Sequence, residues 1–142
     1  MHLIRFALVG RALRMLAMED NPVAEGLDRR ALDTIRALEK PGSGAVLQRV
    51  LGIYLKNSPK LVQTMRDAAN VGDAVVLGNA AHALKSSSLY VGAAWIGALC
   101  REIEAAARST PPVISSALVA ALESGYPRVE QLLRAELEQG KA

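Results

Sequence analysis

The chain has 142 residues, which is enough for one domain with a modest core and too short for a nucleotide-binding fold beside a second domain. Alanine (24) and leucine (20) fill 44 positions, whereas Phe, Trp and Tyr together number five, and this excess of helix formers excludes an all-β fold. The net charge of +3 arises within residues 1–18, because 14 basic and 14 acidic side chains balance over residues 19–142. The absence of net charge over residues 19–142 argues against nucleic-acid binding, which needs a basic surface.

We expect residues 1–20 to form an N-terminal extension that is helical. Three arginines interrupt its apolar run: Arg5, Arg11 and Arg14. The uninterrupted part is shorter than the roughly 20 apolar residues that span a bilayer, and the arginines do not share one helical face, so no membrane contact is expected. No small-residue cleavage site follows, which disfavours a signal peptide. The alternative is that the natural chain begins at Met15 or Met18.

Residues 20–27 contain the helix breakers Pro22 and Gly26 and are predicted to be a linker. Asp28 is a typical N-cap, and it predicts a short helix that ends near Glu39. The apolar residues of this helix recur at helical spacing: Leu32, Ile35 and Leu38.

A Lys-Pro-Gly-Ser-Gly sequence over residues 40–44 predicts a turn, and a long apolar periodicity follows over residues 45–70. Pro59 lies in the middle of this stretch. Either one helix kinks at Pro59, or Ser58 caps a new helix that has the proline as its first residue. We favour one kinked helix, because the apolar stripe continues on both sides of the proline.

Three further helices are predicted, over residues 74–91, 93–108 and 114–138. Asp73 is the expected N-cap of the first, and Gly92 is expected to end it in a left-handed conformation. The residues expected to face the core in the other two are Ile96, Leu99, Cys100, Ile103, Leu118, Leu122, Tyr126, Val129, Leu132, Leu133 and Leu137. Four substantial helices with short loops predict an all-α, antiparallel up-and-down four-helix bundle, preceded by the N-terminal extension.

The helix over residues 74–91 has an apolar stripe on one side and His82 on the other. The stripe consists of Leu77, Ala80, Leu84, Ser88 and Val91, and the helical neighbours of His82 are Val75, Gly78, Asn79, Lys85, Ser86 and Leu89. An exposed imidazole is a good nitrogen nucleophile near neutral pH, and a lysine one turn on can neutralise an anion placed on that nitrogen. Gly78 and Ser86 would let the backbone of a partner approach. The alternative is that His82 is an ordinary surface histidine.

The sequence His82-Ala-Leu-Lys-Ser-Ser-Ser-Leu-Tyr-Val-Gly-Ala93 resembles the His-x-Leu-Lys-Gly-Ser-Ser-x-x-x-Gly-Ala signature of histidine-containing phosphotransfer (Hpt) domains. Leu99-Cys100-Arg-Glu-Ile-Glu104 is similar to the second family motif, Leu-Cys-x-x-Leu-Glu. The resemblance covers about residues 27–138, which we take as the domain.

The resemblance implies a four-helix bundle that takes a phosphoryl group from the aspartyl phosphate of a receiver domain and passes it to another receiver. It implies that His82 is the phospho-acceptor through Nε2, that Lys85 neutralises the phosphoryl oxygens and that Glu104 accepts a hydrogen bond from Nδ1–H of His82. The alternative for Glu104 is a solvated surface charge. The implied partners are response-regulator receiver domains and a sensor (hybrid) histidine kinase, which would dock around Val75 and Leu89 with Gly78, Asn79 and Ser86.

The sequence departs from the signature at Ser86, which replaces the usual glycine. Its hydroxyl either donates to the phosphoryl group or slows transfer. A second functional hypothesis is a docking bundle that binds receivers without phosphorylation, whereas a kinase fragment is disfavoured because Ala83 and Leu84 follow the histidine. We expect a stoichiometric carrier and not an enzyme, monomeric and cytoplasmic, with no cofactor and no metal. The single cysteine, Cys100, excludes an internal disulfide and fits a reducing compartment.

Overall fold

The computed structural model describes residues 26–40 and 43–139. Over these residues the chain forms five helices and no strand: α3 (Arg29–Arg36), α4 (Ala45–Val71), α5 (Ala74–Tyr90), α6 (Ala94–Ala107) and α7 (Ser116–Gln139). The predicted all-helical fold is therefore confirmed. The predictions for residues 1–20, for a start at Met15 or Met18 and for most of the linker lie outside the described residues.

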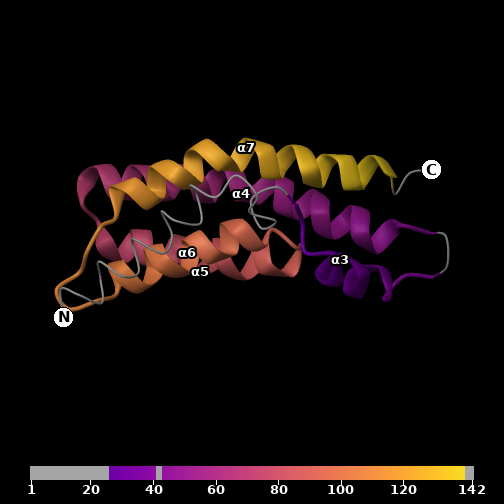
Figure 1. The fold of residues 1–142 in the computed structure, drawn as a ribbon, viewed down its shortest axis with the longest axis horizontal. Helices are drawn as coiled ribbons and strands as arrows, with labels where there is room; N and C mark the ends of the chain where they lie inside the picture. The colour runs from indigo at the N-terminus through magenta and orange to yellow at the C-terminus, as the bar shows by residue number, and fades with distance from the viewer. Residues whose placement is uncertain (1–25, 41–42, 140–142) are drawn as a thin grey trace.

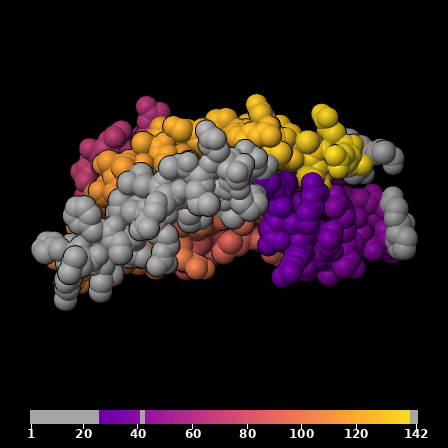
Figure 2. All heavy atoms as spheres, in the orientation of Figure 1, coloured from indigo at the N-terminus to yellow at the C-terminus, as the bar shows by residue number. Residues whose placement is uncertain are grey.

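Helices α4 to α7 run alternately up and down and lie side by side as an antiparallel bundle (Figure 1). Helices α5 and α6 form the closest pair, and α4 packs against both α5 and α7. The short helix α3 lies beyond the ends of α5 and α6 and below the C-terminal part of α7 (Figure 2). It packs against α4.

Local capping sets most of the helix boundaries. The side chains of Asp28 and Asp73 accept hydrogen bonds from the backbone N–H groups of Arg30 (3.0 Å) and Val76 (3.1 Å), so both predicted N-caps are confirmed. Gly92 follows α5 with a φ of 85°, the left-handed conformation predicted for it.

The predicted end of the first helix near Glu39 is wrong, since α3 ends at Arg36. Leu38 lies in the following turn and is 65% exposed, although its spacing suggested a core position. In the turn that follows α3, the carboxylate of Glu39 accepts a hydrogen bond from the backbone N–H of Leu47 at the start of α4, at 2.6 Å. Gly44, the N-cap residue of α4, has no side chain to do this.

Helix α4 is a single helix with Pro59 inside it, as favoured from the sequence. Ser58 does not cap a new helix. It is buried, and its hydroxyl shares a 2.6 Å hydrogen bond with the hydroxyl of Tyr126 on α7. The equivalent pair between α4 and α5 joins Tyr54 and Ser88 at 2.7 Å.

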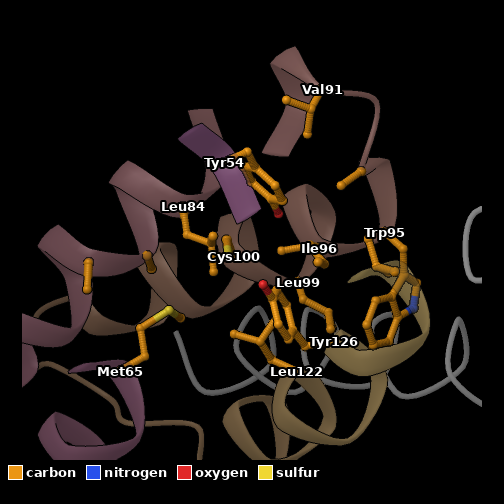
Figure 3. Close-up of a cluster of buried hydrophobic side chains, with 14 of the residues drawn as sticks. Tyr54, Met65, Leu84, Val91, Trp95, Ile96, Leu99, Cys100, Leu122 and Tyr126 are labelled. Carbon is orange, nitrogen blue, oxygen red and sulfur yellow. The ribbon is translucent and has the colours of Figure 1, made fainter. Parts of the chain in front are cut away.

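The core lies between the four long helices (Figure 3) and contains most of the residues predicted to face inward. Leu132 and Leu137 are only partly buried, whereas their neighbour Glu136 is 2% exposed. Its carboxylate pairs with Arg29 at 2.5 Å and with Arg36 at 2.9 Å, so α3 is fastened to the end of α7 by two ion pairs. Among the described helices, none combines the length and apolar character needed to cross a membrane.

Candidate functional site

His82 lies on the outer face of α5, and its side chain is 55% exposed. The opposite side of the helix is buried as predicted, and comprises Leu77, Ala80, Leu84, Ser88 and, just after the helix, Val91. The core therefore fixes the rotation of α5 about its axis, and this rotation presents the imidazole at the edge where α5 meets α6.

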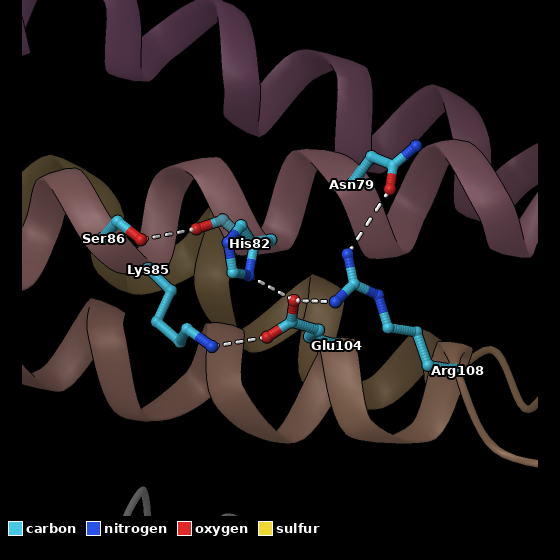
Figure 4. A network of polar contacts seen from close by, with 6 residues as sticks. All are labelled: Asn79, His82, Lys85, Ser86, Glu104 and Arg108. Carbon is cyan, nitrogen blue, oxygen red and sulfur yellow. Dashed lines mark hydrogen bonds and ion pairs between the residues drawn. The ribbon is translucent and has the colours of Figure 1, made fainter.

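Three side chains converge on the carboxylate of Glu104, which comes from α6 and is 9% exposed (Figure 4). Nδ1 of His82 lies 2.6 Å from Oε2, and Nζ of Lys85 lies 2.5 Å from Oε1. Nη1 of Arg108 also lies 2.8 Å from Oε2. The expectation that Glu104 is adjacent to His82 agrees with this geometry, and the alternative of a solvated surface charge does not.

Burial raises the pKa of Glu104, but the hydrogen bonds from Lys85 and His82 and the charges of Lys85 and Arg108 outweigh burial and lower the pKa below its ordinary value of 4.5. The carboxylate is therefore ionised at neutral pH and can only accept hydrogen bonds. Because of this, Nδ1 of His82 must be the donor in the 2.6 Å contact. In the neutral ring the proton is then on Nδ1, and Nε2 keeps its lone pair.

The two exposed apolar residues predicted near His82 are accessible: Val75 is 73% and Leu89 43% exposed. Asn79 and Ser86 are exposed as well. The hydroxyl of Ser86 donates to the backbone carbonyl of His82 at 3.2 Å, which occupies it within its own helix. Ser87 bonds back in the same way to the carbonyl of Ala83 at 3.1 Å.

The prediction that Gly78 is an open position for a partner is wrong. The sequence suggested an open position where the backbone of a partner could approach, but Gly78 is buried. A Cβ atom there would lie 3.5 Å from Cγ of Arg108 and 3.6 Å from Cβ of Ala107, so the side chain of Arg108 already covers this part of α5. The helical wheel of α5 alone could not show this, because the covering residues belong to α6.

Arg108 is a site residue that the sequence analysis did not identify. Besides the ion pair with Glu104, its Nη2 donates to Oδ1 of Asn79 at 3.4 Å, so the guanidinium bridges α6 and α5. The signal was the i,i+4 spacing of Glu104 and Arg108, which places both on one helical face. This spacing is common on solvated helices and becomes informative only once Glu104 is known to be buried.

An apolar groove of about 340 Å³ lies between α4 and α5, on the side of α5 away from Glu104. Ala83 and Ser87, which follow the histidine along α5, form part of its wall. Ile53 and Tyr90 line it and are more than half exposed. Within the part of the chain that the structure describes, no three His, Cys, Asp or Glu residues are grouped so that they could hold a metal ion.

The model of a known family, described as the Hpt domain, matches residues 49–139 of this chain. Searches among curated proteins and solved structures found no significant match. The matched residues run from the first part of α4 to the end of α7 and contain the histidine, the lysine and the glutamate described above. They make up more than half of the sequence. The chain therefore belongs to the Hpt domain family, whose members are phosphotransfer modules of phosphorelays.

Proposed function

We propose that this chain is a phosphorelay carrier in which Nε2 of His82 accepts a phosphoryl group from the aspartyl phosphate of one receiver domain and passes it to the aspartate of another. The observation that supports this most directly is the contact between Nδ1 of His82 and the ionised carboxylate of Glu104, because in the neutral ring it leaves the lone pair on Nε2 of an exposed side chain. The chain acts once per phosphoryl group, as a carrier and not as an enzyme.

The transfer step balances without a further reactant. The lone pair of Nε2 forms the N–P bond, the P–O bond to the receiver aspartate breaks, and the electron pair of that bond returns to the aspartate carboxylate. The proton on Nδ1 stays in place, so the phosphorylated ring carries a positive charge beside the negative charge of Glu104. Most of the remaining charge stabilisation comes from the metal and lysine that receiver domains supply, and this chain contributes a positioned nucleophile.

Lys85 is the residue that meets the phosphoryl oxygens. It lies one turn after His82 on the same face, and its side chain is 21% exposed, so the ammonium is partly open to solvent while Oε1 of Glu104 holds it. Rotation of this flexible side chain would bring Nζ from the carboxylate to the phosphoryl group. A single mobile ammonium suits this task, because it neutralises charge without a fixed geometry.

The surface around His82 supports docking of a receiver. Val75 and Leu89 are exposed apolar residues on the same face of α5, and the groove lined by Ile53 and Tyr90 lies beside it. Ala83 and Ser86 lie beside the imidazole on α5 and are small and exposed, so a partner loop that carries an aspartyl phosphate can reach Nε2. We assign this surface to receiver domains of a sensor (hybrid) kinase and of a response regulator.

The decisive experiment follows label from a panel of receiver domains charged with acetyl phosphate to the wild-type chain and to His82→Gln. We expect acid-labile, alkali-stable label on the wild type and none on the variant. Unlabelled wild-type protein with an intact helical spectrum, across several receivers, would favour the docking bundle without phosphorylation. Label that persists in His82→Gln would exclude His82 as the acceptor.

A further inference from the structure

The two oxygens of Glu104 have different partners. Among the described residues Oε1 is held by Lys85 alone, whereas Oε2 accepts a hydrogen bond from Nδ1 of His82 and forms an ion pair with Nη1 of Arg108. Lys85 can therefore leave the carboxylate without disturbing the oxygen that faces the histidine. Arg108 cannot be removed in the same way, because it fixes that oxygen.

The backbone of Arg108 is held at the end of α6, and its side chain is 51% exposed. The residue is the C-cap of α6, and its backbone N–H donates to the carbonyl of Glu104 at 3.0 Å. Its Cγ would lie 3.5 Å from a Cβ atom on Gly78, which has no side chain. Its guanidinium reaches across to Oδ1 of Asn79 on α5, at 3.4 Å (Figure 4). A cation at the C-terminal end of a helix is also favoured by the helix dipole.

The charge balance of the site depends on this arginine. The positive charges of Lys85 and Arg108 exceed the negative charge of Glu104 by one when the imidazole is neutral. Transfer of a phosphoryl group adds one net negative charge and brings the group to neutrality. Without Arg108 the same step would begin at neutrality and end with one uncompensated negative charge, and Lys85 would have to serve both Glu104 and the phosphoryl group.

We propose that Arg108 is a positioning residue that keeps Glu104 paired and directed at Nδ1 of His82, so that Lys85 is free to move to the phosphoryl group. The inference rests on the proposed role of His82 as the phospho-acceptor. Arg108 does not touch the reacting atoms, and its contribution depends on the negative charge of Glu104. That dependence distinguishes it from an arginine that binds the phosphoryl group or the partner directly.

The test compares Arg108→Gln, Arg108→Lys and the double variant Arg108→Gln/Glu104→Gln in transfer from a charged receiver. We expect Arg108→Gln to transfer about tenfold more slowly than wild type and Arg108→Lys to fall between the two. The double variant should be faster than Arg108→Gln, because a neutral amide still accepts from Nδ1 but no longer retains Lys85. Arg128→Gln, which removes an exposed charge from α7, is the matched control and should transfer at the wild-type rate.

A second readout is the ¹⁵N spectrum of the imidazole rings, which is simple because the chain has only two histidines, His2 and His82. We expect the wild type to show the Nδ1–H tautomer of His82 and Arg108→Gln to show a mixture of tautomers. Wild-type rates and an unchanged spectrum in Arg108→Gln would overturn the proposal, and so would a double variant no faster than Arg108→Gln. If the wild type takes no label, the proposed function fails, and the tautomer spectrum still decides whether Arg108 positions Glu104.

Discussion

Replacing Lys85 by methionine tests the central charge interaction of the site. The substitution keeps the length and the apolar part of the side chain and removes the ammonium. In the resting structure that ammonium contacts Oε1 of Glu104 and makes no contact with His82, whose Nδ1 is bound to Oε2. The variant should therefore transfer more slowly while the tautomer of His82 stays as in the wild type.

The structure also sets the size of the effect. A hydrogen bond to a charged group contributes about 1.5–3 kcal/mol. Lys85 must give up its bond to Glu104 before it reaches the phosphoryl oxygens, so the net gain lies at the lower end of that range. A loss of about 1.4 kcal/mol of transition-state stabilisation corresponds to a roughly tenfold slower transfer.

The assay is single-turnover transfer from a charged receiver, with Lys85→Arg to restore the charge and Arg128→Met as a charge-loss control on α7. We expect Lys85→Arg to recover most of the rate and the control to be unaffected. Transfer at the wild-type rate by Lys85→Met would refute the role given to the lysine. A slower rate accompanied by a changed tautomer would also refute the reasoning, because it would mean that Lys85 orients the histidine.

Three further predictions concern stability. Burial raises the pKa of Glu104, but the donors around it lower the pKa by more, so its stabilising contribution is complete above about pH 4.5 and is lost on acidification. The unfolding free energies of wild type and Glu104→Gln, from urea titrations, should therefore converge as the pH falls below about 4.5. Glu136→Gln should cost about 1–3 kcal/mol and speed hydrogen exchange in α3, since the two arginines it releases are partly exposed and regain water. A Cβ atom on Gly125 would clash with the ring of Trp95, so Gly125→Ala should destabilise the fold by about 1–3 kcal/mol. A Cβ atom on Gly52 would meet nothing within 4 Å, so Gly52→Ala should stabilise the fold by about 1 kcal/mol. Equal effects of the two substitutions on thermal unfolding would contradict the packing argument.

The helices were predictable wherever local chemistry determines their ends. Asp28 and Asp73 bond to backbone groups two and three residues away, and Gly92 takes the left-handed conformation at the end of α5. The end of α3 was not predictable in the same way. Glu39 lies outside the helix and bonds to Leu47, eight residues further on, and the apolar periodicity through Leu38 gives no sign of this contact.

In the site, the residues of α5 could be placed from the sequence because they share one helix. The contact to Glu104 followed from the resemblance of the second motif and not from spacing, since it joins residues 22 positions apart. The roles of Arg108 and Gly78 depend on the packing of α6 across α5, which no pattern within one helix records. The same reason explains the burial of Glu136, for which the sequence carries no signal, because its carboxylate pairs with Arg36, 100 residues earlier.

A carboxylate beneath the histidine has two opposing effects on the proposed transfer. It attracts the positive ring that forms when Nε2 is phosphorylated, and an amide at position 104 would provide the hydrogen bond without that attraction. It also attracts Lys85, which in the proposed function neutralises the phosphoryl group. In our proposal Arg108 resolves this conflict, because it pairs with the oxygen that already faces His82 and leaves the other oxygen to Lys85. The glutamate, the lysine and the arginine therefore make one unit, and each substitution should be interpreted through its effect on the other two.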